Sequence, residues 1–239
     1  GEQGAENVGV VVMDPDTGEV LAMASNDAYD LNNPRDLTPF YSQEEINAMS
    51  EEDMLENLNS IWKNYCVSDA FEPGSTVKPM TVGAGLETGA ITYDDTFYCG
   101  GYEVVADRTI KCSVYPGAHE TQTLSETMKN SCNCAMMQIA ESMGVGEFVD
   151  YQLNVFNFGS KTGIDLPGEA AGITYNDSSM GQAELATCSF GQGFTCTMIQ
   201  EAAAASSCIN GGYYYQPHVV KQVINSEGAV VKNIEPELL

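Results

Sequence analysis

A serine and a lysine three positions apart are the residues of this chain best suited to covalent chemistry. Ser75 follows a Pro-Gly pair that breaks the preceding structure, and Lys78 opens an apolar run to about Leu86. Such a run can be helical, which predicts Ser75 at a helix N-terminus with Lys78 one turn later on the same face. The helix dipole favours oxyanion charge there, and a desolvated lysine amine can accept the serine proton. The pair is a candidate nucleophile with its base.

A second polar motif follows at Ser131-Cys132-Asn133, in a segment whose sequence predicts a helix end or a tight turn. A hydroxyl and an amide two residues apart can point into one site, where the hydroxyl relays a proton and the amide binds a substrate carbonyl. An isolated Ser-x-x-Lys is more often an N-cap serine with a solvated lysine. The second motif is what favours catalysis over that alternative.

Three further residues suit a metal. The chain has eight cysteines, and Cys99, Cys112 and His119 lie in and just after an expected hairpin from Tyr98 to Tyr115. A zinc site needs soft ligands that a hairpin can bring together, and no fourth ligand is assignable from the sequence. A Cys99–Cys112 disulfide and unlinked thiols remain open as alternatives.

The elements that must position these residues alternate between strands and helices. A strong Asp-Pro-Asp-Thr-Gly turn separates two apolar runs, which predicts an N-terminal hairpin. The segment 26–65 is acidic and carries two capping-box-like starts, at Ser42 and Ser50, so we expect a surface helical insertion. Apolar spacing predicts helices over 123–143, 145–156 and 198–208, and a closing hairpin from 217–224 and 230–234.

Five longer stretches carry a family pattern in addition to the two motifs. They lie at 10–25, 71–78, 162–169, 190–193 and 209–212. With them, nearly the whole chain resembles the transpeptidase domain of class B high-molecular-weight penicillin-binding proteins. The resemblance implies an α/β (α+β) fold like that of penicillin-binding transpeptidases and serine β-lactamases, with an antiparallel sheet flanked by helices. It also implies that residues 1–239 form a partial domain without the C-terminal sheet strands.

The resemblance implies a role for each residue of the two motifs. Ser75 attacks the carbonyl of the penultimate D-Ala of a peptidoglycan stem peptide, and Lys78 is the base. Ser131 passes the proton to the leaving amine, and Asn133 holds the substrate amide. β-Lactams imitate the first step. The resemblance implies that no metal or organic cofactor takes part in the reaction, so a zinc ion at Cys99, Cys112 and His119 would be structural. The implied location is the extracytoplasmic face of the cell membrane, with an upstream anchor and partners from cell-wall synthesis.

The family's third motif, a Lys-Thr-Gly on the strand at the edge of the active site, is the main departure. It normally follows the Asn210 region by several tens of residues, and this chain ends at Leu239. Residues 161–163 spell Lys-Thr-Gly, but Pro167 and Gly168 follow closely and oppose a central strand. We therefore leave Lys161 out of the catalytic set and expect the 239-residue chain alone to be weakly active or inactive.

The composition limits the classes of molecule that the protein can bind directly. The 34 acidic and 9 basic residues give a net charge of −25, which argues against nucleic acid or an anionic membrane surface. No apolar stretch reaches the length of a membrane span. Two other functions remain open: a non-catalytic cell-wall binding or scaffold module, and a serine β-lactamase or β-lactam sensor. The stretches 26–65 and 162–169 match transpeptidases better than β-lactamases.

Overall fold

The N-terminal hairpin forms where the sequence predicts it. In this computed structural model, which describes residues 4–5, 7–26 and 28–239, β1 (Gly9–Met13) and β2 (Val20–Ser25) pair antiparallel. The turn is closed by a hydrogen bond of 3.0 Å from the Gly18 N–H to the Asp14 carbonyl, with Gly18 at φ 75°, a value that favours glycine. One side of the hairpin packs on α8 (Met198–Ile209), around the buried Ile199.

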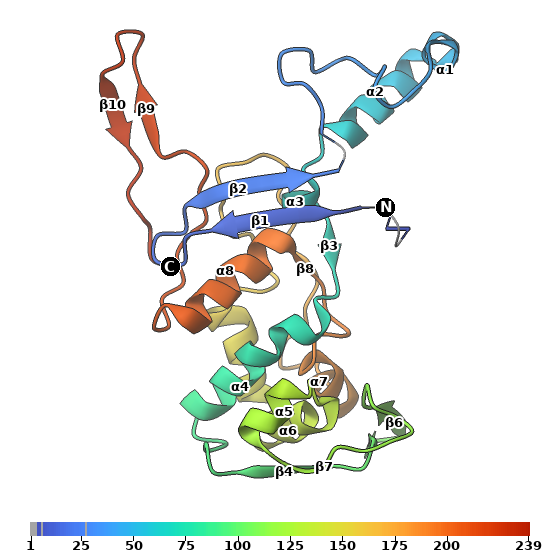
Figure 1. Ribbon diagram of the computed structural model, residues 1–239, viewed down its shortest axis with the longest axis vertical. Helices are drawn as coiled ribbons and strands as arrows, with labels where there is room; N and C mark the ends of the chain where they lie inside the picture. The colour runs from blue at the N-terminus through green and yellow to red at the C-terminus, as the bar shows by residue number, and fades with distance from the viewer. Residues whose placement is uncertain (1–3, 6, 27) are drawn as a thin grey trace.

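The acidic segment contains the two predicted helices, α1 (Gln43–Ala48) and α2 (Glu51–Ile61). Both begin with the capping boxes that the sequence indicates, one from Ser42 and one from Ser50. The helices share a small apolar cluster around Leu37, Leu58 and Ile61 and project from the body of the molecule (Figure 1).

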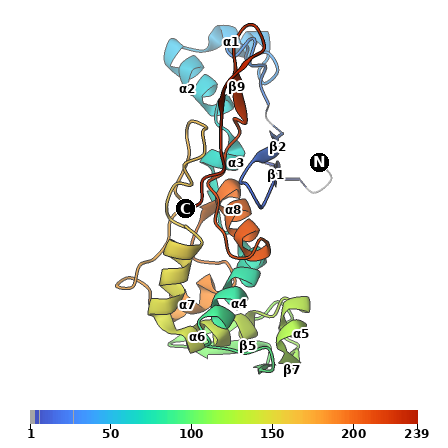
Figure 2. The same cartoon turned by 90° about the vertical axis from the view of Figure 1, so that its left-hand side faces the viewer.

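The segment that carries the candidate nucleophile begins beneath the N-terminal hairpin and ends in a helix of the main core. The short α3 (Tyr65–Ser68) leads to β3 (Ala70–Phe71), which pairs with β8 (Cys196–Thr197). A 3₁₀ turn, η1 (Gly74–Val77), then continues as α4 (Lys78–Glu87). The predicted helical start is confirmed, with the refinement that Ser75 lies in the 3₁₀ turn. Helix α4 packs against both α6 and α8 (Figures 1 and 2).

Four short strands follow α4. The hairpin of β5 (Tyr102–Val105) and β6 (Arg108–Lys111) turns at residues 106 and 107, and β4 (Thr96–Cys99) pairs with β7 (Glu120–Thr123) outside it. The predicted hairpin from Tyr98 to Tyr115 is thus too long at both ends, because Tyr98 pairs with Thr121 on β7. The longer loop between β6 and β7 brings residues 112–119 back toward β4.

Helices surround the second motif. α5 (Leu124–Lys129) ends just before it, and α6 (Asn133–Asp150) begins at its last residue, with a kink at Gly144 and a π-helical continuation, η2 (Tyr151–Val155). The predicted helices in this region are confirmed. The inner face of α6 is completely buried, through Ala135, Met136, Ile139 and Ala140. This face anchors the main apolar core.

The last elements are α7 (Gln182–Cys188), α8 and the closing hairpin of β9 (Gln222–Ile224) and β10 (Val230–Asn233), whose strands are shorter than predicted. The hairpin projects from the same end of the molecule as α1 and α2, at the upper left of Figure 1, where the two helices lie at the upper right. Within the described residues, no helix has both the length and the apolar character needed to cross a membrane.

Candidate active site

The amine of Lys78 is the centre of the candidate site. The side chain is 2% exposed, and its Nζ donates to Ser131 Oγ at 2.8 Å, Ser131 O at 2.7 Å and Asn133 Oδ1 at 2.8 Å. The charged form can donate one N–H to each of these acceptors, and the neutral amine, with two N–H bonds, can accept from the Ser131 hydroxyl instead. Burial lowers the pKa of Lys78, while nearby Cys112 and Cys132 act in the opposite direction. The lowered pKa favours the neutral amine that a general base requires.

The second motif is held in a strained turn that aims two oxygens at this amine. Ser131 has φ 50°, in the left-handed region, and its hydroxyl and carbonyl oxygens both accept from Lys78. The turn is fixed by a hydrogen bond of 2.9 Å from the Cys132 N–H to the carbonyl of buried Thr127. Strain of this kind persists where surrounding contacts hold it in place, which is common at functional sites.

Asn133 links the lysine to the strands below it. Its Nδ2 donates to the carbonyl of Lys111 at 3.3 Å, which leaves Oδ1 to accept from Lys78. The residue therefore joins α4, the start of α6 and the end of β6.

Ser75 lies at the solvent-facing side of the same helical run. The side chain is exposed, whereas Lys78 is buried, and the Lys78 N–H donates to the Ser75 carbonyl. Residues three apart in a helix are neighbours on its surface. The structure thus brings Lys78, Ser131 and Asn133 into direct contact and places Ser75 one turn before the lysine.

The loop at residues 191–193, called the glycine loop below, supports the turn that carries Ser75. This supporting role was not predicted from the sequence. The Gly74 N–H donates to Gly191 O at 2.9 Å, and the Gly193 N–H donates to the Glu72 carboxylate at 2.8 Å. Gly191 has φ 86°, and a Cβ there would clash with the Gly74 carbonyl. The only sequence signal was the presence of residues 71–78 and 190–193 in separate family-like stretches.

The Lys-Thr-Gly of residues 161–163 lies outside any strand. Thr162 donates from both its N–H and its hydroxyl to Glu169, each at 2.6 Å, and Gly163 has φ 81°. The segment is a closed loop, so the prediction that it is no edge strand is confirmed.

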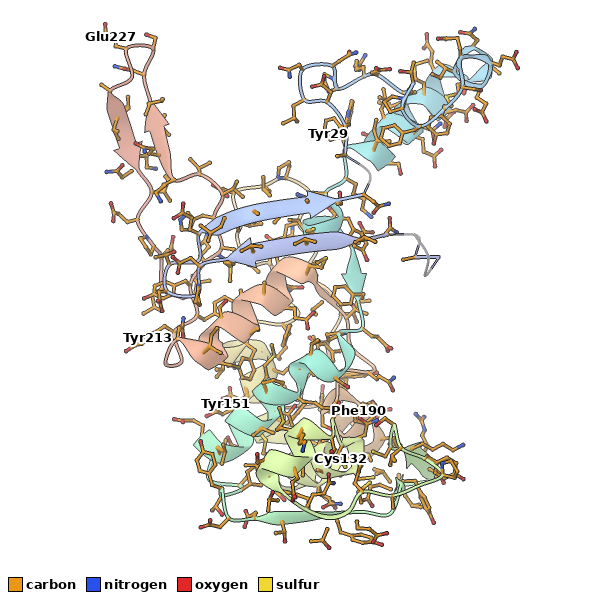
Figure 3. All side chains as sticks on the ribbon, viewed as in Figure 1. Tyr29, Cys132, Tyr151, Phe190, Tyr213 and Glu227 are labelled. Atoms are coloured by element: carbon orange, nitrogen blue, oxygen red, sulfur yellow. The ribbon has the colours of Figure 1, made fainter. Side chains whose placement is uncertain are left out.

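The three predicted metal ligands converge on a fourth residue, Cys132. One ligand atom from each of Cys99, Cys112, His119 and Cys132 lies within 4.8 Å of the others. The three thiols are buried, and His119 is half-buried. Figure 3 shows Cys132 inside the helical end of the molecule. These cysteines are free thiols, so the Cys99–Cys112 disulfide considered from the sequence is not formed.

The thiols of this cluster differ from those elsewhere in the chain. A hydrogen bond from Cys134 lowers the pKa of Cys132 despite its burial, and the same bond raises the pKa of Cys134. By contrast, burial raises the pKa of Cys188 to about 12. Thiolate is thus favoured at Cys132 and disfavoured at Cys188.

The model of the penicillin-binding protein transpeptidase domain matches residues 8–237. The chain belongs to this family. This transpeptidase-family chain is 36% identical to stage V sporulation protein D of Bacillus subtilis (strain 168) over 217 residues, which cover 90% of the chain and 30% of that protein. It is 28% identical to peptidoglycan D,D-transpeptidase MrdA of Acinetobacter baumannii over 234 residues, 94% of the chain and 34% of the relative. The chain spans about a third of the length of these relatives.

Solved structures agree with the family. Penicillin-binding protein 3 from Mycobacterium tuberculosis, complexed with ampicillin, has a TM-score of 0.79 at 26% identity, covering 98% of this chain and 47% of that one. A peptidoglycan synthetase from Bifidobacterium adolescentis has a TM-score of 0.76 at 25% identity, covering 97% and 38%. The predicted penicillin-binding α/β fold is confirmed. The relatives' names favour a transpeptidase over the β-lactamase and scaffold alternatives.

Proposed function

We propose that this chain provides the acylating centre of a peptidoglycan D,D-transpeptidase. The observation that carries the proposal is the buried amine of Lys78, bonded to Ser131 and Asn133 one helical turn after Ser75. A structural lysine would keep its charge at the surface, because burying an ammonium is costly. A base that must be neutral at working pH gains from the same burial.

In the first half-reaction, the Lys78 amine accepts the hydroxyl proton of Ser75, and the serine oxygen attacks the carbonyl carbon of the penultimate D-Ala. The tetrahedral intermediate collapses with cleavage of the C–N bond. Ser131, in hydrogen-bond contact with the lysine, passes the proton to the leaving amine. The products are free D-Ala and an ester on Ser75.

In the second half-reaction, an amine from a neighbouring stem peptide attacks this ester and forms the cross-link. The attacking amine gives up a proton to Lys78, and Lys78 passes that proton to the serine oxygen as the ester C–O bond breaks. Asn133 keeps the lysine in place through Oδ1, and the N–H of its Nδ2 that Lys111 does not use is the group offered to the substrate. These steps use side chains alone, with no cofactor. A β-lactam follows the first half-reaction, but the cleaved amide nitrogen stays tethered in the acyl-enzyme.

The proposal also includes the cellular location of the protein. The cross-linked substrate lies outside the cytoplasm, so the protein works at the extracytoplasmic face of the membrane, held by an upstream anchor and in contact with other cell-wall synthesis proteins. The net charge of −25 fits neither nucleic acid nor an anionic lipid surface as a direct partner.

Labelling with a fluorescent penicillin tests the proposal. In the full-length protein, Ser75→Ala and Lys78→Arg should lose labelling, because an arginine stays charged at any ordinary pH. Lys63→Arg is the matched control, since Lys63 is at the surface in an ion pair with Asp69. Circular dichroism checks that each variant keeps its fold. Native-rate labelling of Lys78→Arg would assign the base elsewhere.

The 239-residue chain measured alone is expected to label slowly or not at all, because the only Lys-Thr-Gly in its sequence lies in a loop. Loss of one oxyanion donor costs on the order of 10²–10³ in rate. Rapid, stoichiometric labelling of this chain would show that the third motif has been misplaced.

A further inference from the structure

Lys111 is an exposed lysine at the end of β6, beside the second motif. Its carbonyl accepts from Asn133 Nδ2 at 3.3 Å, and its Nζ lies 4.5 Å from the ring centroid of Tyr115. Tyr115 packs edge-on against Tyr102, with 6.3 Å between the ring centroids. We propose that Lys111, Tyr115 and Tyr102 form a binding subsite for a free carboxylate of the stem peptide that acylates Ser75, called the donor peptide below.

The charge of Lys111 is not used by the fold. In the part of the chain that the structure describes, none of the ion pairs includes this lysine. Arg108, on the same strand, differs because Asp107 and Glu184 each lie 4.0 Å from its guanidinium group. The whole chain has 34 acidic residues and 9 basic ones, so most cations have acidic neighbours available. The Lys111 charge therefore remains available to a ligand.

The backbone fixes the three side chains of the subsite relative to one another. Tyr102 and Lys111 lie directly opposite each other in the pairing of β5 with β6, so they share one face of the hairpin. After Lys111 the chain folds back, and the Tyr115 N–H donates at 3.1 Å to the carbonyl three residues earlier. Gly101, with φ 90°, lets the Gly117 carbonyl approach where a Cβ would clash. A preorganised subsite of this kind loses less side-chain freedom when a ligand binds.

The shared face is the outer one of the hairpin. Glu103, next to Tyr102, is turned toward α6, where its carboxylate accepts from Gln138 Nε2 at 2.7 Å. Tyr102 and Tyr115 are 46% and 45% exposed, and β6 lies at the lower right edge of the molecule (Figure 1). The outer face therefore presents one cation and two half-exposed rings to solvent, without the Glu103 carboxylate.

These groups suit a carboxylate on a short aliphatic side chain. An ammonium group pairs with a carboxylate, and the Tyr115 ring beneath it keeps the amine in place through its quadrupole. The two rings can cover methylene groups, and their hydroxyls can donate to the same carboxylate. A local cation also offsets the repulsion that a chain of net charge −25 exerts on an anionic peptide.

The position of Asn133 assigns the carboxylate to one part of the donor peptide. The Asn133 Nδ2 contacts the Lys111 carbonyl and, in the proposed mechanism, also the amide of the donor peptide. The residue just upstream of the penultimate D-Ala then lies nearest to Lys111. Its side-chain carboxylate is distinct from the terminal carboxylate of the peptide, which departs with the leaving D-Ala. This assignment rests on the proposed function.

Two penicillins that differ only at the end of the acyl side chain test the subsite in the full-length protein. One side chain ends in a carboxylate, and the other ends in a primary amide of the same length. At low salt, the carboxylate probe should acylate Ser75 about 3–5-fold faster, a size typical of one exposed ion pair. The preference should fall as the ionic strength rises. Equal rates for the two probes at low salt would overturn the proposal.

Charge variants on β6 separate a subsite from a general effect of charge. Lys111→Gln should remove the preference, mainly by slowing the carboxylate probe, and Lys111→Arg should keep it, since a guanidinium group also stacks on a ring. Arg108→Gln removes the same charge from the same strand and should keep the preference. Equal losses in Lys111→Gln and Arg108→Gln, or equal slowing of both probes in Lys111→Gln, would contradict the subsite.

Binding to an inactive variant separates this proposal from the transpeptidase function. In full-length Ser75→Ala, a ligand-observed NMR titration should show about 3–5-fold tighter binding of the carboxylate probe, and Lys111→Gln in that background should abolish the difference. A protein that binds with this preference but is never acylated would contradict the acylation mechanism alone. A protein that is acylated equally by both probes would contradict the subsite alone.

Discussion

The helical end of the molecule and its hairpin end differ in how completely their side chains are packed. In the helical end, around α4, α5 and α6, the inner face of α6 is fully buried and even the Lys78 amine is 2% exposed. The hairpin end is the part around β1, β2, β9 and β10 (Figure 1). There, all residues of β9 and β10 are exposed, and Val10 on β1 is 52% exposed.

This difference in packing explains why the candidate active site lies in the helical end. A buried amine needs partners with fixed positions, since an unpaired polar group in the interior is costly. The helical end supplies them from an ordered turn between two helices, above a large apolar core. The hairpin end has only the smaller apolar cluster around Ile199, and its exposed strands contribute nothing to the contacts of Lys78 among the described residues.

The comparison predicts unequal costs for truncating apolar side chains in the two regions. Met136→Ala, in the fully buried face of α6, should reduce the free energy of unfolding by about 2–5 kcal/mol, because it leaves a cavity. Val10→Ala, on the half-exposed strand, should cost below about 1 kcal/mol. Urea unfolding followed by circular dichroism measures both. Similar losses for the two variants would contradict the difference in packing.

Two glycines with positive φ sharpen the comparison. Gly191 and Gly212 have φ of 86° and 97°, but an added Cβ clashes with Gly74 only at position 191 and meets nothing within 4 Å at position 212. Gly212→Ala should therefore cost about 1 kcal/mol from backbone strain alone. Gly191→Ala should cost about 2–3 kcal/mol and also slow penicillin labelling, because it moves the turn before Ser75. Equal labelling rates in the two variants would remove the supporting role of the glycine loop.

Glu201 on α8 gives the smallest expected effect. Burial raises its pKa, a contact with Thr76 offsets this in part, and its Oε1 is buried without a hydrogen-bond partner among the described residues. Below the unfolded pKa of about 4.3 the carboxyl is neutral in both states. As the pH rises through the raised folded pKa, the buried group must ionise, and stability is lost.

Glu201→Gln should therefore raise the Tm by about 2–4 °C at pH 8, which corresponds to about 1 kcal/mol, and by less at pH 5. Glu147→Gln is the control, because Glu147 is exposed on α6. Thermal melts from pH 4 to 8 measure the effect. A gain that does not grow with pH would assign it to something other than the charge of Glu201.

Features set by neighbouring residues were predictable from the sequence. The Asp14–Gly18 turn, the capping boxes at Ser42 and Ser50, and the start of the helical run near Ser75 were all predicted correctly, because each depends on contacts within a few positions. The pairing of Lys78 with the second motif was expected from the family resemblance rather than from the local pattern.

Contacts between distant segments were not predictable in the same way. The bond from Gly193 to Glu72 joins residues 121 positions apart and has no local signature. The predicted hairpin of Tyr98 to Tyr115 was too long, because the pairing of β4 with β7 depends on the return of the chain after β6. For the same reason Cys132 was interpreted only as part of the second motif, although the fold places it beside Cys112.

The position of the acyl group tests the central claim most directly. The full-length protein, treated with penicillin and digested with trypsin, should carry the adduct on Ser75, as located by tandem mass spectrometry, and the adduct should be absent from the Ser75→Ala variant. An adduct on Ser131, on a cysteine of the metal cluster, or on a new residue in the Ser75→Ala variant would contradict the assignment of Ser75 as nucleophile and Lys78 as its base.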